Sequence, residues 1–258
     1  MISPLKAEPL YNPGGGARRA LRARAARALS LVIVAISSAV FGLGVLASRA
    51  APDAFVVALF AAAVVIAITA LVVAMWRFDS DAARMEQGAK GETAVGQFLE
   101  RYHAVDGARL FHHVPFDRFD IDHVLVHRTG VYAIETKTLS KRAGSSARLL
   151  YDGEQVAFEN GRALERNPVI QATANARAAS DLIAESTGRR IQVRPVVLFP
   201  GWWIDARPGA HRRCWVLNPK SLDSFLTSRT ERLTPEDVSL IAFHLGRYIR
   251  SEAKRAAA

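Results

Sequence analysis

The sequence predicts a mixed α/β domain that is preceded by a hairpin of two transmembrane helices. Residues 28–48 and 54–76 are two uncharged, strongly apolar stretches, and each is long enough to cross a bilayer as a helix. From residue 91 onward, strand-like runs alternate with amphipathic helical patterns in the order helix, strands, helix, strands, helix. This order predicts a sheet flanked by helices.

The charges around the apolar stretches predict their orientation. Only residues 49–53 separate the two stretches, and they include Pro52, so the helices form a tight hairpin whose ends lie on one side of the membrane. Residues 1–27 are far richer in arginine than this linker, which places both termini in the cytoplasm. We therefore expect a basic cytoplasmic tail (1–27), a connector (77–90) and a cytoplasmic domain (91–258) at the inner membrane, with the lipid bilayer as a partner.

A cleaved signal peptide is an alternative for the first stretch, because Ser48-Arg49-Ala50 loosely resembles a cleavage site. The stretch is longer than the roughly 7–15 apolar residues of a signal-peptide core, which favours a membrane span. The single cysteine, Cys214, cannot form an intrachain disulfide, and this agrees with a reducing compartment.

The net charge of +10 is compatible with a polyanionic partner. Anionic lipid accounts for the basic tail. The excess in the C-terminal part fits nucleic acid, and a solvated basic surface explains it equally well. This excess includes Lys141, Arg142, Arg189, Arg190, Arg194, Arg212 and Arg213.

Periodicity and capping residues predict the elements of the domain. Val95 and Leu99 mark the apolar face of a first helix that ends near residue 103, and Glu92 lies on that same face. Asn167 and Pro168 are typical of the N-cap and the first residue of a helix. The expected later helices are 168–185 and a closing helix capped by Thr234, and the expected strands are 109–114, 119–127, 131–138, 148–151, 155–159, 192–199 and 213–217.

Two apolar strands carry charged residues in their interior, where an ionised group is costly unless it is paired or bound to a metal. If Thr129 and Gly130 form a two-residue turn, Asp122 lies opposite Lys137, and Glu135 lies diagonal to Asp122. All three charged side chains then project from one face of the sheet.

Two carboxylates on adjacent strands with a lysine beside them suit metal-assisted hydrolysis of a phosphodiester. Asp122 and Glu135 would hold Mg²⁺ or Mn²⁺, and Lys137 would orient the attacking water or offset charge on the phosphoryl oxygens. Glu92 is a candidate third metal ligand, direct or through water, and Gln171 is a candidate positioning group. The alternative is an ordinary ion pair between Asp122 and Lys137 with Glu135 in solvent. The apolar flanks of both strands favour the site.

Several short motifs follow one another in the domain: Gly91-Glu92, Ile121-Asp122-His123, TGVYAIETK at 129–137, and Asn167-Pro168 with Gln171. In this order they resemble the nuclease-related domain (NERD) family of the PD-(D/E)XK, restriction-endonuclease-like superfamily. The resemblance implies a Mg²⁺-dependent nuclease with a mixed central sheet flanked by helices, in which Asp122, Glu135 and Lys137 are catalytic and Glu92 and Gln171 support them. After Lys137 the chain lacks the family's prompt glycine-containing turn, so loops that face the substrate are expected to differ.

The sequence thus predicts a membrane-anchored, cytoplasm-facing, metal-dependent nuclease, with DNA expected as the substrate ahead of RNA. A non-catalytic nucleic-acid-binding or scaffolding module at the membrane is the alternative, because it would keep the basic surface and the fold without using the charged trio. A purely structural membrane protein is a third reading. The presence of both carboxylates and the lysine favours the nuclease, since a phosphate-binding module has no need of an acidic pair.

Overall fold

The computed structural model describes residues 86–103, 107–117, 119–140 and 146–257, together with single positions between residues 30 and 73. Contacts divide the chain into two compact units, and the unit with the strands contains Gly88–Ala258. Apart from those single positions, the predicted tail and both predicted membrane spans lie outside the described residues. Within the described residues, no helix is both long and apolar enough to cross a bilayer.

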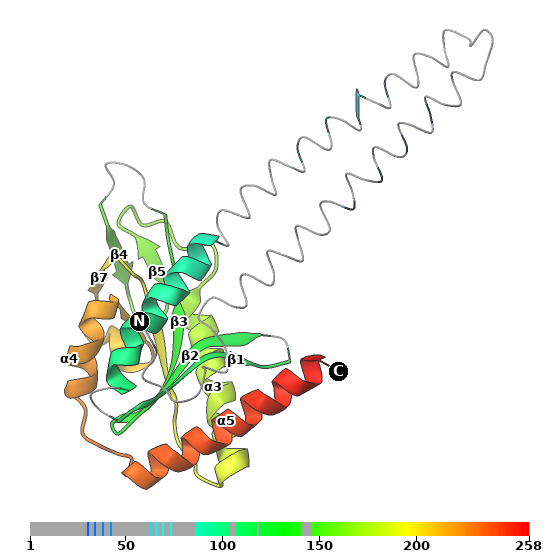
Figure 1. Ribbon diagram of the computed structural model, residues 1–258. Helices are drawn as coiled ribbons and strands as arrows, with labels where there is room; N and C mark the ends of the chain where they lie inside the picture. The colour runs from blue at the N-terminus through cyan, green and yellow to red at the C-terminus, as the bar shows by residue number, and fades with distance from the viewer. Residues whose placement is uncertain are drawn as a thin grey trace, which may run out of the picture. The chain divides into compact units, whose positions relative to one another are not determined.

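A five-stranded mixed sheet forms the centre of the domain (Figure 1). Its strands are β1 (Arg109–Pro115), β2 (Asp120–His127), β3 (Gly130–Thr136), β6 (Arg194–Leu198) and β8 (Trp215–Leu217). The order is β1-β2-β3-β6-β8, in which β1, β2 and β3 pair antiparallel and β3, β6 and β8 run parallel. Every residue of β3 after Gly130 is buried, as expected for a central strand that is covered on both faces.

Helices cover both faces of this sheet: residues 86–103, α3 (Pro168–Thr187), α4 (Leu222–Thr227) and α5 (Pro235–Ala257). On one face, α3 and α5 pack against Val124 and Ala133. On the other face, the helix of residues 86–103 and α4 pack against Leu125 and Ile134. Because side chains alternate along a strand, each strand contacts both helical layers. This arrangement confirms the predicted mixed sheet flanked by helices.

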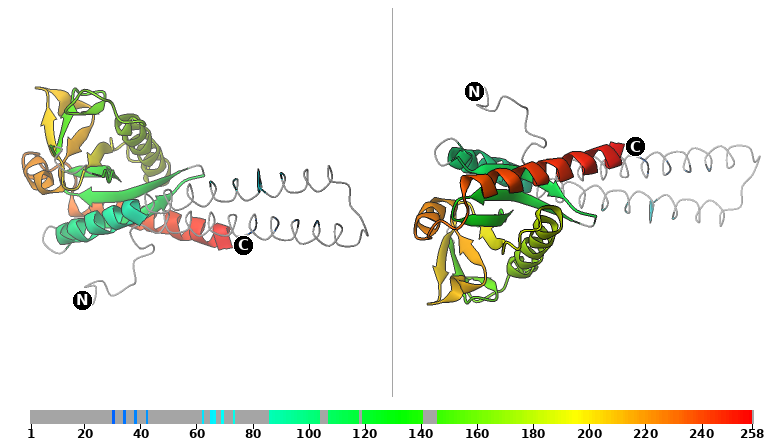
Figure 2. Two further views of the ribbon diagram at one scale, coloured as in Figure 1. Left: turned by 90° about the horizontal axis from the view of Figure 1, so that it is seen from above. Right: turned by 90° about the horizontal axis from the view of Figure 1, so that it is seen from below.

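A smaller sheet lies at the end of the domain away from α5 (Figure 2). It has the order β5-β4-β7, with β4 at Arg148–Tyr151, β5 at Val156–Phe158 and β7 at Trp203–Ala206. Leu149 and Tyr151 pack against Val197 and Val216 of the central sheet. The sequence predicts β4 and β5, whereas β7 is a strand that it does not predict. Two 3-10 turns, Ala210–Arg212 and Pro219–Ser221, flank β8.

The turn between β2 and β3 differs from the predicted one. Val126 pairs with Val131 and His127 pairs with Gly130, so the two turn residues are Arg128 and Thr129 rather than Thr129 and Gly130. The backbone carbonyl of Arg128 is held in the turn by hydrogen bonds of 2.8 and 2.9 Å from the N–H groups of the two residues at 232 and 233. With the turn in this position, every β2 residue pairs with a β3 residue two positions earlier than predicted. Each side chain stays on the predicted face of the sheet, but its cross-strand partner changes.

The predicted helix starts at Asn167 and Thr234 are confirmed. Asn167 Oδ1 accepts a 3.0 Å hydrogen bond from the N–H of Val169 at the start of α3. Thr234 Oγ1 accepts a 3.2 Å hydrogen bond from the N–H of Asp237 at the start of α5. These caps satisfy N–H groups that have no partner within the helix. Gly188 ends α3 with a φ of 71°, a left-handed conformation that glycine adopts without steric cost.

Candidate functional site

Glu135, near the end of β3, is the centre of the candidate site. It is 4% exposed, and both of its carboxylate oxygens accept hydrogen bonds. Glu135 Oε1 accepts from Lys137 Nζ at 2.7 Å and from Gln171 Nε2 at 2.7 Å. Glu135 Oε2 accepts from Asn175 Nδ2 at 3.1 Å. Strand β3 and helix α3 therefore meet at this carboxylate.

Asp122 supplies the second carboxylate from β2. Its Oδ2 accepts a 2.7 Å hydrogen bond from the backbone N–H of Thr136. The last pair of the β2–β3 ladder is His123 with Ile134, and one further step in this register places Asp122 opposite Glu135. The corrected turn thus brings the two acids directly across from each other, where Lys137 had been expected to lie opposite Asp122.

The electrostatic environment of Asp122 disfavours its ionised form. Burial raises the pKa of this carboxyl well above its usual range, and the negative charges of Glu135 and Glu92 raise it further. The hydrogen bond from Thr136 and the charge of Lys137 act in the opposite direction but are weaker. Glu92, on the helix of residues 86–103, is therefore close enough to interact with Asp122.

Glu135 also carries a raised pKa, because burial outweighs the stabilisation that its partners give to the negative charge. Lys137 is the strongest of these partners, and Gln171 and Asn175 follow. Two adjacent carboxylates that are both costly to ionise form a site that a cation would stabilise.

Lys137 links the buried acid to the surface of the domain. The side chain of Lys137 is 29% exposed, whereas that of Glu135 is 5% exposed. Lys137 Nζ also donates to Gln171 Oε1 at 2.9 Å, so Gln171 bridges the lysine and the glutamate. The backbone N–H of Lys137 donates to the carbonyl of Leu198 at 2.9 Å, which extends the β3–β6 pairing past the end of β3. The ammonium group is thus held beside Glu135 and is more exposed than that carboxylate.

The donor chemistry of the site suits Mg²⁺ or Mn²⁺, because carboxylate oxygens are hard ligands. Asp122 and Glu135 are the two carboxylates that the register places opposite each other. No group of three or more His, Cys, Asp or Glu side chains in the described part of the chain is arranged to hold a metal ion. Two carboxylates, those of Asp122 and Glu135, are therefore the groups that would bind a cation. Glu92 is close enough for its charge to raise the pKa of Asp122.

Gly91 explains how the helix of residues 86–103 approaches the site. A Cβ atom at this position would overlap with the hydroxyl of Thr138, the residue after Lys137. Only glycine lets the helix pass this close to the segment after β3. The next residue, Glu92, is thereby placed near the carboxylate of Asp122.

The structure brings Asp122, Glu135, Lys137 and Gln171 together. Asn175 also belongs to the site, although it was not among the residues predicted from the sequence. It lies four residues after Gln171, so both amides project from the same face of α3 toward Glu135. A polar residue one turn after a candidate site residue, on the buried face of a helix, is the signal that would have identified it.

One comparison with known proteins gives a match. Residues 87–200 match the family model described as NERD, the nuclease-related domain. No curated protein and no solved structure matches the chain. The matched segment begins in the helix that carries Glu92 and ends just after β6, so it includes every residue of the candidate site. Residues 87–200 of this chain therefore form a nuclease-related domain of the restriction-endonuclease-like superfamily.

Proposed function

We propose that the protein is a metal-dependent nuclease that hydrolyses phosphodiester bonds, with DNA as the substrate ahead of RNA. The observation that carries this proposal is the pair of carboxylates formed by the half-buried Asp122 and the buried Glu135, with the ammonium group of Lys137 at 2.7 Å from Glu135. The nuclease-related domain supports an action on nucleic acid. A purely structural role would not require two adjacent acids that raise the free energy of the folded state when they ionise.

Asp122 and Glu135 would hold the divalent cation, with Glu92 contributing through a water molecule. When bound there, Mg²⁺ or Mn²⁺ would polarise the scissile phosphate and lower the pKa of a water molecule. Asn175 and Gln171 hold the Glu135 carboxylate in a single orientation through Oε2 and Oε1. A fixed carboxylate needs little reorganisation when the substrate binds.

Lys137 would act on the substrate rather than only on Glu135. Its side chain is 29% exposed, so its ammonium group would be accessible to a phosphoryl oxygen or to the attacking water. Negative charge grows on the phosphoryl oxygens during hydrolysis, so a positioned cation lowers the barrier. Gln171 Oε1 is a positioning group here, because it accepts from Lys137 Nζ and limits where the ammonium can go.

We propose further that the two apolar stretches anchor the domain to the cytoplasmic face of the inner membrane. Among the single positions described there, Val34, Val65 and Ile66 are helical and expose 62%, 61% and 69% of their surface. Large exposed apolar side chains on helices are the surface that a lipid environment would cover. This observation supports the membrane anchor that the hydropathy of residues 28–48 and 54–76 predicts.

The alternative is a nucleic-acid-binding or scaffolding module without catalysis. The ion pair between Lys137 and Glu135 favours it, since the acid is already neutralised within the protein. A substrate panel separates the two functions. The full chain in detergent is incubated with linear, nicked and single-stranded DNA and with RNA, in Mg²⁺, in Mn²⁺ and in EDTA. Metal-dependent cleavage supports the nuclease, whereas tight binding without cleavage of any substrate supports the module.

A further inference from the structure

A pocket lies at the end of the central sheet opposite to the end that carries Glu135. It has a volume of about 710 Å³ and is formed by the first residues of β3, β6 and β8, by α3 and by the segment before α5. Parallel strands begin at the same edge of a sheet, so Gly130, Arg194 and Trp215 lie together there. Glu135 lies near the other end of β3. The volume is in the range of about 300–1,000 Å³ that small-molecule sites occupy.

Arginine dominates the lining of this pocket. No aspartate or glutamate lines it. In the described part of the chain, Arg213 is the only one of the lining arginines that forms an ion pair, at 3.7 Å from the exposed Glu154. The lining arginines are Arg177, Arg190, Arg194, Arg212, Arg213, Arg229 and Arg232.

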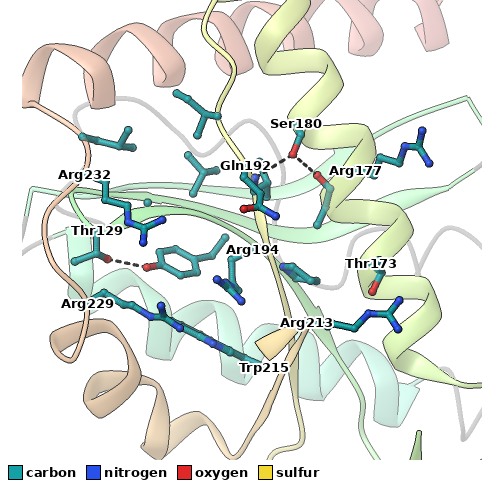
Figure 3. Close-up of a pocket in the computed structure, with 18 of the residues that line it drawn as sticks. Thr129, Thr173, Arg177, Ser180, Gln192, Arg194, Arg213, Trp215, Arg229 and Arg232 are labelled. Carbon is teal, nitrogen blue, oxygen red and sulfur yellow. Dashed lines mark hydrogen bonds between the residues drawn. The ribbon is translucent and has the colours of Figure 1, made fainter. Parts of the chain in front are cut away.

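Three of these arginines are held close together. Figure 3 shows Arg194, Arg229 and Arg232 around the same space, although they come from β6 and from the segment between α4 and α5. The guanidinium carbons of Arg194 and Arg229 lie 5.5 and 5.4 Å from the ring centre of Trp215, which is 1% exposed. Arg194 Nη1 also donates to the carbonyl of Arg212 at 2.8 Å. These contacts hold the guanidinium groups of Arg194 and Arg229 near each other in spite of their mutual repulsion.

Repulsion within this arginine cluster raises the free energy of the folded protein when no ligand is bound. Burial lowers the pKa of Arg194, and the neighbouring charges of Arg229 and Arg232 lower it further. Tyr132 and Thr129, whose hydroxyls lie 2.8 Å apart, also line the pocket and add neutral polar groups to it. Like charges gathered without a carboxylate are stabilised by a bound anion.

We propose that this pocket binds a compact ligand that carries a triphosphate group, such as a nucleoside triphosphate or inorganic triphosphate. The guanidinium group matches phosphate through two parallel hydrogen bonds, which favours a phosphate ligand for an arginine-lined site. Several guanidinium groups line the pocket and no carboxylate does, so a ligand that balances their charge must carry several negative charges in a small volume. A triphosphate supplies these charges. A nucleic acid strand would instead require a basic groove that follows its backbone.

The test is calorimetric titration of the full chain in detergent with inorganic triphosphate, ATP, AMP and adenosine, all in EDTA so that the acidic site holds no cation. The proposal predicts saturable binding of one triphosphate or one ATP per chain, and weaker binding of AMP by at least about tenfold. Adenosine should not bind measurably. Equal affinity for ATP and inorganic triphosphate would show that the triphosphate is recognised alone, and tighter ATP binding would show a nucleoside contact as well.

Variants locate the binding. Arg229→Gln and Arg232→Gln should each weaken triphosphate binding at least about tenfold, because each removes a charge-assisted contact. Arg247→Gln, on the exposed face of α5 and outside the pocket, is the matched control and should bind like the parent chain. Glu135→Gln should also bind normally, which separates this pocket from the proposed nuclease site.

Three results of the triphosphate titrations would overturn the proposal. They are an absence of saturable triphosphate binding in the parent chain, an equal loss of binding in Arg247→Gln, and unchanged binding in Arg229→Gln and Arg232→Gln. A chain that binds single-stranded DNA through Arg229 and Arg232 but does not bind triphosphate would assign the pocket to the nucleic-acid surface, and would also overturn it. Thermal denaturation of each variant in EDTA confirms that the chain is folded.

Discussion

Asp122 Oδ2 accepts a 2.7 Å hydrogen bond from the backbone N–H of Thr136, the residue that follows Glu135. This bond joins a side chain of β2 to the end of β3, and it fixes the Asp122 carboxylate beside the Glu135 carboxylate. The fold therefore holds a half-buried and a buried acid side by side, where each is costly to ionise. A site of this kind gains function at the expense of stability.

Asp122→Asn is predicted to stabilise the protein at pH 7.5 in EDTA while it abolishes cleavage. The pKa of Asp122 is raised in the folded state, so the folded protein binds this proton more tightly than the unfolded chain. Stability from this group is complete below the unfolded pKa of about 3.9 and is lost as the pH rises through the folded pKa. Asparagine removes the charge, and its oxygen still accepts from Thr136. The melting temperature of Asp122→Asn should be higher than that of the parent chain. Asp181→Asn, which changes an exposed residue of α3, should leave the melting temperature unchanged.

Divalent cations are predicted to raise the melting temperature of the parent chain at pH 7.5. A ligand that binds only the folded state stabilises it in proportion to the logarithm of its concentration. Asp122→Asn and Glu135→Gln should lose this shift in Mn²⁺, whereas Lys137→Ala should keep it, because the lysine competes with a cation for Glu135. A shift that persists in Glu135→Gln would contradict the proposed ligands.

Asn175→Ala is predicted to move the acid limb of the cleavage pH profile to higher pH. Asn175 is 4% exposed and donates to Glu135 Oε2, which favours the ionised carboxylate. Loss of this donor raises the pKa of Glu135, so a higher pH is needed to ionise it. Ser186→Ala, also on α3, is the control and should keep the parent profile. An unchanged acid limb in Asn175→Ala would show that Glu135 does not titrate in the rate-limiting step.

The protein is predicted to lose stability as the pH falls from about 6.5 toward 4, in part through two buried histidines. His112 Nδ1 and His123 Nδ1 lie 2.8 Å apart, a contact that requires at least one neutral ring. Burial lowers the pKa of His112 to about 4 and that of His123 well below its usual range. The unfolded chain therefore takes up protons that the folded protein excludes.

Urea denaturation at several pH values tests this contribution. The double variant with His112→Leu and His123→Leu should show a smaller loss of unfolding free energy between pH 6.5 and 5 than the parent chain. Protonation of Asp122 stabilises the folded protein as the pH falls, which opposes the effect of the histidines. The informative quantity is therefore the difference in slope between the double variant and the parent chain. His244→Gln on α5 should keep the parent slope. An equal slope in the double variant would assign the acid sensitivity to other groups.

Features that depend on neighbouring residues could be predicted from the sequence. Asn167 with Pro168 and Thr234 identified the starts of α3 and α5, because a capping side chain bonds to N–H groups within three residues. The even length of the β2–β3 turn put Asp122 and Glu135 on one face, since side chains alternate along each strand. The choice of candidate acids followed from charge within apolar strands.

Features that depend on distant residues could not be predicted in this way. The β2–β3 register was wrong by two residues, because the Arg128 carbonyl is bonded by a segment a hundred residues later in the chain. The arginine pocket joins Arg194, which the sequence analysis noted as basic, with Arg229 and Arg232, which it did not. Only the packing of α4 and α5 on the central sheet brings these residues together.

The most direct test of the proposed nuclease is a cleavage assay of the full chain in Mg²⁺ with single variants of the acidic site. The parent chain should cleave the substrate, and so should Glu165→Gln and Lys220→Ala, which are exposed controls. Glu135→Gln should be inactive in Mg²⁺ and in Mn²⁺, and Lys137→Ala should lose a factor of about 10²–10³ in rate, as expected for the loss of one positioned charge. Full cleavage by both Glu135→Gln and Lys137→Ala would contradict the assignment of these two residues to a nuclease site.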